Sequence, residues 1–178
     1  MIWDGQEFEA VIATPGCGKS WLCDKYPERF VDVDEVRLRL KYVIPEDITR
    51  EELERTKGDR QFPRRMHTEE CFKAIVPILD KAREEGKILI SAPHPQIFDY
   101  FVDRNIKACF VFPDKDMREE MKRRFVDRRN SQKFIDENDE LFDAFLVSND
   151  KETRCACKYV FGKGEYLQDI LVKFGLEF

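Results

Sequence analysis

The chain alternates short apolar runs with longer stretches in which apolar residues recur at helical spacing. Five of the short runs have the length of buried strands: residues 7–13, 29–34, 87–91, 107–112 and 156–161. Between and after them the pattern predicts helices at about 19–26, 35–42, 66–85, 96–103, 114–129, 134–147 and 165–174. Because strands and helices alternate, we expect an α/β fold whose five-stranded parallel sheet is covered by helices on both faces.

Length and composition set limits on this picture. The 178 residues are expected to form a single domain, and the polar, proline-interrupted segment 44–65 to form a cap or insertion on it. The net charge of −5 argues against a polycation that binds nucleic acid non-specifically, but it allows a local basic groove. No apolar run approaches the ~20 residues of a membrane-spanning helix, and no secretion signal is visible. We therefore expect a cytoplasmic protein with no membrane contact and no obligate protein partner.

The six cysteines are scattered, and only Cys155 and Cys157 lie close together in the chain. A C-x-C pair on a strand directs both thiols to one face, which is half of a zinc site. The chain offers no second such pair and has two histidines in all, so we interpret these thiols as structural.

Residues 13–20 read ATPGCGKS, a Walker A motif with Ala13 in place of the first glycine. The motif follows an apolar strand and opens a helix, which is the context that a phosphate-binding loop requires. Gly16 and Gly18 allow backbone N–H groups to turn toward phosphate oxygens, Lys19 supplies positive charge, and Ser20 offers a hydroxyl to magnesium. We expect the nucleotide to bind the following residues: Pro15, Gly16, Cys17, Gly18, Lys19, Ser20 and Trp21.

Two classes of phosphate-loop protein fit the rest of the chain poorly. A motor-type ATPase needs a carboxylate at the end of an apolar strand, whereas the third strand runs into SAPH at 91–94. A GTPase needs the guanine-reading sequence N-K-x-D, which SNDK at 148–151 does not supply.

The second predicted strand ends in two carboxylates, Asp32 and Asp34. Strand alternation places both on one face, at the sheet edge where ligands of α/β proteins bind. We assign Asp34 as the base that accepts the proton of an attacking hydroxyl, and Asp32 as a contact to the acceptor and, through water, to the metal. Arg37 lies three residues beyond Asp34 and suits contact with the acceptor. The alternative is an acidic strand end beside a surface arginine.

A strongly basic stretch, MREEMKRRFVDRR, occupies residues 117–129 after the fourth strand. Arg124 and Arg128 are four residues apart and share a helix face. Guanidinium groups neutralise the charge that spreads over a phosphoryl group during its transfer. We therefore assign both arginines to catalysis, against the alternative of a solvated basic face paired with Glu119 and Glu120.

The order of these motifs resembles the P-loop nucleoside and nucleotide kinases. That resemblance implies a sheet of strand order 2-3-1-4-5 with a small lid between the fourth and fifth strands, here the arginine-bearing region 117–135. It also makes 44–65 an acceptor-side cap. Asp34 with Arg37 looks like the base and acceptor-side arginine of polynucleotide 5′-hydroxyl kinases. Trp21 departs from the Ser or Thr that usually follows the loop.

A closer resemblance, to the phage kinases that phosphorylate 5-hydroxymethyluracil in DNA, rests on five segments. They are FVDVDE (30–35), QFP (61–63), ILISAPHP (88–95), the stretch 109–135 and GEYLQDIL (164–171). By position this resemblance aligns Asp32, Asp34, Arg124 and Arg128 with family residues, and it adds His94 as an acceptor contact and Asn130 in the lid. Glu35 and Val36 replace two family serines, and Arg129 replaces a lid glycine.

Together these observations predict an ATP- and Mg²⁺-dependent phosphotransferase whose acceptor is a hydroxyl of a nucleotide or nucleic acid. The resemblance favours the hydroxymethyl group of 5-hydroxymethyluracil in DNA, within the host cell if the chain is phage-encoded. A free nucleoside or nucleotide kinase, a polynucleotide 5′-hydroxyl kinase and a non-catalytic nucleotide-binding regulator stay open as alternatives.

Overall fold

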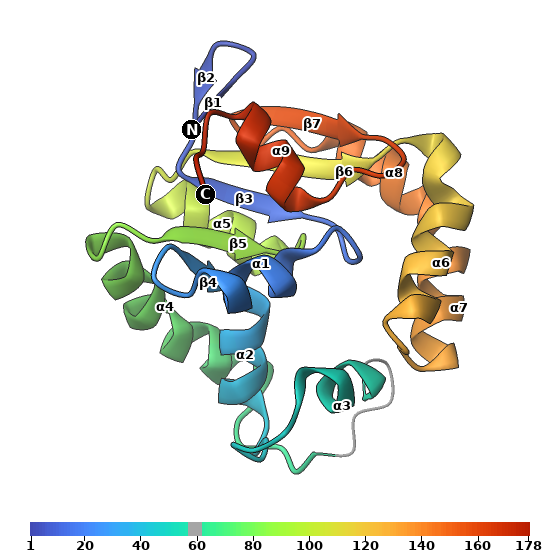
Figure 1. Ribbon diagram of the computed structural model, residues 1–178. Coiled ribbons are helices and arrows are strands. Elements are labelled where there is room, and N and C mark those ends of the chain that lie inside the picture. The colour runs from blue at the N-terminus through green and yellow to red at the C-terminus, as the bar shows by residue number, and fades with distance from the viewer. Residues whose placement is uncertain (57–61) are drawn as a thin grey trace.

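The computed structural model describes residues 1–56 and 62–178 and contains a five-stranded, fully parallel sheet (Figure 1). Its spatial order is β4-β5-β3-β6-β7. The strands are β3 (Ala10–Ala13), β4 (Phe30–Asp32), β5 (Ile88–Ser91), β6 (Ala108–Pro113) and β7 (Cys157–Phe161). Every residue of β3 and β6 is buried, as expected for the centre of a sheet covered on both faces.

The strand numbering differs from the expectation because the chain begins with a hairpin that the apolar pattern did not predict. Strands β1 (Ile2–Trp3) and β2 (Gln6–Glu7) pair antiparallel in a sheet of their own. Counted over the whole chain, the main sheet therefore has the order 4-5-3-6-7; counted over its own five strands, the order is 2-3-1-4-5. The predicted first strand, 7–13, is correspondingly too long, because Glu7 belongs to the hairpin.

Helices cover both faces of the sheet. Helices α1 (Lys19–Lys25) and α9 (Leu167–Lys173) pack on one face, where their apolar residues join Val11 and Val111 in a buried cluster. The other face is covered by α4 (Thr68–Glu84) and α5 (Pro95–Asp103). Alternating strand side chains supply both clusters, since Ala10 and Ile12 belong to the second.

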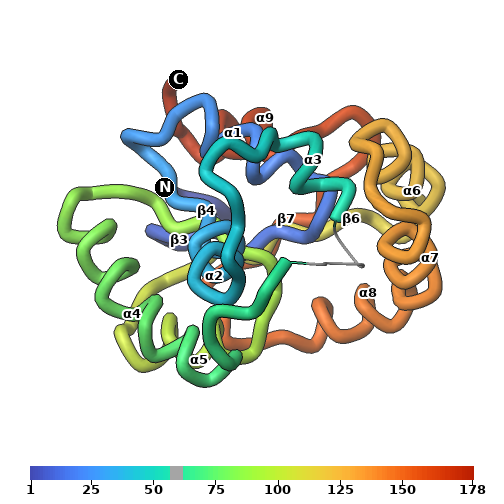
Figure 2. Tube along the Cα trace, turned by 90° about the horizontal axis from the view of Figure 1, so that it is seen from below, coloured from blue at the N-terminus to red at the C-terminus, as the bar shows by residue number. Residues whose placement is uncertain are grey.

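A helix that the sequence analysis did not predict lies in the polar segment 44–65. Helix α3 (Arg50–Arg55) begins with a reciprocal capping box between Thr49 and Glu52 and buries Leu53 against the end of α2 (Val33–Lys41). Figure 2 shows α3 extending from the end of α2 toward the helices that lie between β6 and β7 in the chain. Part of the expected cap, residues 57–61, lies outside the described residues.

Between β6 and β7 the chain forms a group of helices that contains the predicted lid. A short 3₁₀ turn, Lys115–Met117, leads into α6 (Arg118–Asp127) and α7 (Gln132–Glu140). The last is α8 (Phe142–Lys151). The predicted continuous helix 134–147 is wrong, because the chain breaks between α7 and α8 at Leu141. Among the described residues no helix is long and apolar enough to cross a membrane.

Candidate functional site

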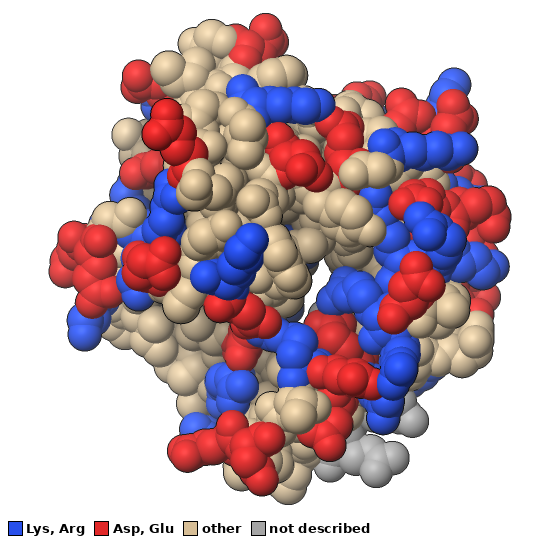
Figure 3. All heavy atoms as spheres, in the orientation of Figure 1, with Lys and Arg blue, Asp and Glu red and all other residues tan. Residues whose placement is uncertain are grey.

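A cavity of about 1080 Å³ lies at the carboxyl ends of β3, β4 and β5. Its walls come from the Gly-rich loop 13–20, the pocket-facing sides of α1, α2 and α3, the end of α6 and the start of α9. Figure 3 shows the molecule hollowed between the α1 and α3 side and the lid helices, with both basic and acidic side chains around the opening. A cavity of this size accommodates a nucleotide together with a second small group.

The Gly-rich loop has the conformation that its glycines permit. Gly16 and Gly18 adopt φ angles of 83° and 97°, in the left-handed region that favours glycine. Lys19 is buried, and its Nζ donates to the main-chain oxygens of Ala13 at 2.8 Å and Thr14 at 3.1 Å. These bonds fix the ammonium group beside the loop, and Lys19 also lines the cavity.

The two glycines also bring other elements close to the loop. A Cβ at Gly16 would lie 2.8 Å from Met121 Cε and 2.9 Å from Phe125 Cε1, both on α6. A Cβ at Gly18 would lie 3.4 Å from Cδ1 of Tyr166, the residue before α9. The base of the lid thus packs directly on the loop, which links the position of the α6 arginines to the loop conformation.

Asp32 is a buried carboxylate beside the loop rather than an exposed strand end. It accepts a hydrogen bond from Ser20 Oγ at 2.9 Å, and it caps α2 by accepting from the backbone N–H groups of Asp34 and Glu35. Burial, followed by the neighbouring charge of Asp34, raises the pKa of Asp32 above its ordinary value. Asp32 does not itself line the cavity.

Asp34 lies in the first turn of α2, which corrects the expectation that it extends the strand. Helix α2 begins at Val33, so strand alternation does not place Asp32 and Asp34 on one face. Asp34 Oδ2 accepts from the backbone N–H of Ala92 at 2.8 Å, and its Oδ1 lies 3.7 Å from Arg37. Both Asp34 and Arg37 line the cavity, as the sequence analysis expected of a base and its neighbour.

Arg124 is buried at the lid side of the cavity, with 3% of its side chain exposed. Its Nε donates to Glu120 at 3.1 Å, its Nη1 donates to Gly16 O at 3.4 Å, and its guanidinium stacks over the Tyr166 ring at 4.1 Å. Among the described residues, Nη2 has no hydrogen-bond partner. A buried guanidinium nitrogen without a partner beside a phosphate-type loop is a fitting donor for an anion.

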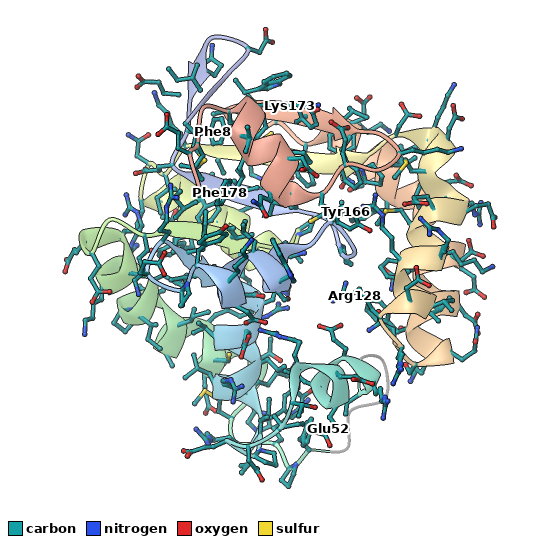
Figure 4. All side chains as sticks on the ribbon, viewed as in Figure 1. Phe8, Glu52, Arg128, Tyr166, Lys173 and Phe178 are labelled. Carbon is teal, nitrogen blue, oxygen red and sulfur yellow. The ribbon has the colours of Figure 1, made fainter. Side chains whose placement is uncertain are left out.

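Arg128 extends from the end of α6 into the cavity and contacts α3 (Figure 4). Its Nη2 lies 2.8 Å from Glu54 Oε2, and Asn130 Nδ2 donates to the same carboxylate and to Glu54 O, both at 3.0 Å. Arg129, which has φ of 56°, pairs with Glu51 one turn earlier on α3. We call these contacts the α3–lid bridge. They join the two sides of the cavity in this conformation.

Besides Asp32, two predicted site residues, Cys17 and His94, do not line the cavity. Cys17 is fully buried inside the loop, where burial raises the pKa of its thiol. His94 caps α5 by accepting from Gln96 N and packs on Phe72, and burial followed by the charge of Arg37 lowers its pKa. Its predicted contact with the acceptor stays a prediction.

The described residues contain no cluster of three or more His, Cys, Asp or Glu side chains placed to hold a metal ion. Cys157 lies opposite Cys109 in the parallel register of β6 and β7, and both thiols are free, as is that of Cys155.

The contributors to the cavity that sequence reasoning missed include Glu54, Tyr166 and Ala92. A signal for α3, and hence for Glu54, was present in the sequence. Thr49-x-x-Glu52 is a capping-box pattern, which predicts a helix start one residue later. Tyr166 and Ala92 carry no local pattern that would have identified them.

Comparisons with known proteins add little. No protein-family model matches the chain, and no curated protein matches it. Among solved structures, an uncharacterized protein from Eubacterium ventriosum aligns with a TM-score of 0.48 at 14% sequence identity. The alignment covers 93% of this chain and 97% of that one.

Proposed function

We propose that the protein is an ATP- and Mg²⁺-dependent phosphotransferase of the P-loop kinase type, which transfers the γ-phosphoryl group to a hydroxyl of a nucleotide or nucleic acid. One observation carries the proposal: groups suited to two different tasks line a single cavity. The first set is the Gly-rich loop with Lys19 and the buried Arg124, whose Nη2 lacks a described partner. The second set is Asp34 with the neighbouring Arg37.

The donor nucleotide would bind on the loop side. Backbone N–H groups of 16–20 and Lys19 would hold its phosphates, and the N-terminus of α1 adds favourable electrostatics. Arg124 would donate to the transferring group, and Arg128 would join it after leaving Glu54. Closure of the lid over the cavity would also exclude water and so limit hydrolysis of ATP.

The residues beside the loop fit a magnesium ion that is held mainly by phosphates. Ser20 Oγ and Asp32 Oδ2 are already 2.9 Å apart, so the hydroxyl could bind the ion directly while Asp32 orients its water. Mg²⁺ commonly uses one or two protein ligands plus phosphate oxygens, so a three-residue cluster is not needed. When bound, the ion would neutralise charge on the β- and γ-phosphates.

Asp34 would act as the general base. Its Oδ2 is fixed by Ala92 N, and its Oδ1 lies on the side of Arg37, which lines the cavity with it. In the proposed step the acceptor oxygen forms a bond to the γ-phosphorus while the bond to the β–γ bridging oxygen breaks. The hydroxyl proton passes to Asp34, and ADP leaves with the bridging oxygen.

A basic strip supports a polyanionic acceptor. Lys41 lies one turn after Arg37 on α2, and the adjoining segment places Arg64 and Arg65 beside it through the Tyr42–Arg64 bridge and the Arg65 N–H to Lys41 O bond of 2.9 Å. Within the described residues, Lys41, Arg64 and Arg65 have no carboxylate within ion-pair distance. These cations favour a nucleic acid, with 5-hydroxymethyluracil in DNA as our first candidate acceptor.

The test is transfer of labelled γ-phosphate to a panel of acceptors. It would hold free nucleosides, nucleoside monophosphates, 5′-hydroxyl oligonucleotides, and DNA with or without 5-hydroxymethyluracil. Label only in the modified DNA supports the first candidate, and label in a free nucleotide or at a 5′-end supports the corresponding alternative.

Asp34→Asn should abolish transfer while ATP binding is retained. Asp24→Asn is the matched control, because Asp24 lines the same cavity but lies on α1 and pairs with Arg50. Tight ATP binding with no transfer to any acceptor, and no effect of Asp34→Asn on residual ATP hydrolysis, would instead support a nucleotide-binding regulator.

A further inference from the structure

Two large apolar side chains that line the cavity are strongly exposed, and both are aromatic. Trp21 on α1 is 54% exposed and Tyr166 before α9 is 44% exposed. Each has a cation over its ring: Lys25 Nζ lies 4.6 Å from the Trp21 ring centroid, and Arg124 stacks over Tyr166. Tyr166 is explained by packing, since it lies against Gly18 as well as under Arg124. Trp21 is not.

Packing within the fold does not account for an exposed indole at position 21. Trp21 directly follows Ser20 of the Gly-rich loop, in the first turn of α1, and it is not among the buried residues of that helix, which are Lys19, Leu22 and Cys23. Apart from Lys25, no ring or cation lies over the indole among the described residues. An exposed indole on the open surface would need no explanation, but this one lines a cavity.

We propose that Trp21 is a stacking platform for the nucleobase of a nucleotide bound in the cavity, with Lys25 holding the indole from its other face. A flat aromatic ring binds any base through its π-face. Because Lys25 is one helical turn after Trp21, its cation can orient the indole without blocking the cavity side. This inference rests on the proposed function, and the base belongs to the donor or to the acceptor, which the experiment separates.

The chain makes the test direct, because it has two tryptophans and the other one is remote from the cavity. Trp3 lies in the N-terminal hairpin, where its Nε1 donates to Lys158 O and its ring contacts Tyr159 and Phe174. In Trp3→Phe, Trp21 is the sole tryptophan. Its fluorescence, excited at the long-wavelength edge of indole absorption where bases absorb little, would then report stacking.

ATP with Mg²⁺ and the acceptor candidates would be titrated separately into Trp3→Phe. Inorganic tripolyphosphate with Mg²⁺ would be the matched ligand that has the phosphates but no base. We expect quenching by ATP, by a base-containing acceptor, or by both, and none by tripolyphosphate. Quenching by ATP assigns the platform to the donor base, and quenching by the acceptor assigns it to the acceptor base. Equal quenching by tripolyphosphate and ATP would overturn the proposal, since it would report only a change in loop conformation.

Substitution gives a second readout by calorimetry in the otherwise native chain. Trp21→Ala should weaken binding of the base-containing ligand about 5- to 150-fold and leave tripolyphosphate binding unchanged. Trp21→Phe should restore most of the affinity, and Lys25→Ala should cost about 2- to 5-fold. Because Trp21 is exposed, its removal should not unfold the protein, which a thermal melt checks.

The two failures are distinguishable. If Lys19→Ala, Trp21→Ala and the native chain all fail to bind ATP or tripolyphosphate, the proposed function falls, and the platform with it. If ATP binds through Lys19 but Trp21→Ala binds ATP and acceptors as tightly as the native chain, the proposed function stands and the platform is refuted.

Discussion

The α3–lid bridge yields a prediction with an internal control, because α3 contributes two glutamates to it in different environments. Glu54 is buried, with 5% of its side chain exposed, and pairs with an Arg128 that is 30% exposed. Glu51 and its partner Arg129 are both more than half exposed. Glu54→Gln and Glu51→Gln therefore make the same chemical change in one helix, to a buried and to an exposed ion pair.

The expected magnitudes follow from burial. A charge-assisted hydrogen bond contributes about 1.5–3 kcal/mol to stability. In Glu54→Gln the guanidinium of Arg128 loses its carboxylate, but it retains access to water, so the higher cost of leaving a buried charge unpaired does not apply fully. An exposed pair contributes about 0.2–1 kcal/mol. Opening of the bridge should thus become about 10- to 150-fold easier in Glu54→Gln and at most about 5-fold easier in Glu51→Gln.

Native-state amide hydrogen exchange measures this directly in peptides covering 50–55 and 124–131, with α4 as the internal reference. Protection should fall in Glu54→Gln by the larger factor and barely change in Glu51→Gln. Glu54→Gln should also bind ATP more tightly, since Arg128 no longer has to leave a carboxylate. Equal protection in both variants would refute the view that the buried pair holds the two sides together.

Three further predictions concern the loop and its surroundings. Burial and the charge of Asp34 raise the pKa of Asp32 in the folded state. As pH rises from the ordinary carboxyl pKa to this higher folded-state pKa, ionisation of Asp32 therefore lowers the stability of the folded protein. Asparagine at position 32 can still cap α2, so Asp32→Asn should raise the melting temperature near pH 7. The gain should vanish as pH falls below the ordinary carboxyl pKa, and phosphoryl transfer should be lost. A lower melting temperature at pH 7 would contradict this reasoning. Arg124→Lys should lower kcat at least about 100-fold in steady-state assays, because an ammonium group cannot both bond across the loop and stack on Tyr166; near-native kcat would argue against its catalytic role. Gly16→Ala forces a side chain into left-handed backbone against α6 and should cost about 1–2 kcal/mol, a drop of roughly 2–8 °C in a thermal melt, and an unchanged melting temperature would refute the close packing of loop and lid.

The features that sequence alone predicted well are those written locally in the chain. The five strands are short apolar runs with both faces covered, and the loop is a motif whose glycines meet a specific backbone requirement. Asp34 and Arg37 both line the cavity, but Asp34 lies on α2 and does not extend the strand as expected, and the roles assigned to the two residues stay predictions. Helix α2 begins two residues earlier than the pattern of 35–42 suggested, because Asp32 caps it.

The features that the sequence did not predict depend on contacts between distant segments. Glu54 and Arg128 are 74 positions apart, and nothing in either neighbourhood indicates that they meet. The break at Leu141 is likewise hidden, because residues on both sides of it continue a helical pattern. Such contacts follow from how the lid folds back toward α3, which periodicity does not encode.

The hydrogen bond from Ala92 to Asp34 determines which substitutions at position 92 a mutational screen will find tolerated. The donor is a main-chain N–H, so every substitution at position 92 that keeps that group also keeps the bond, whatever its side chain. Proline alone among the natural residues lacks the N–H. A saturation library should therefore tolerate many small residues at position 92 and reject proline, and an alanine scan will pass over this contributor to the site altogether.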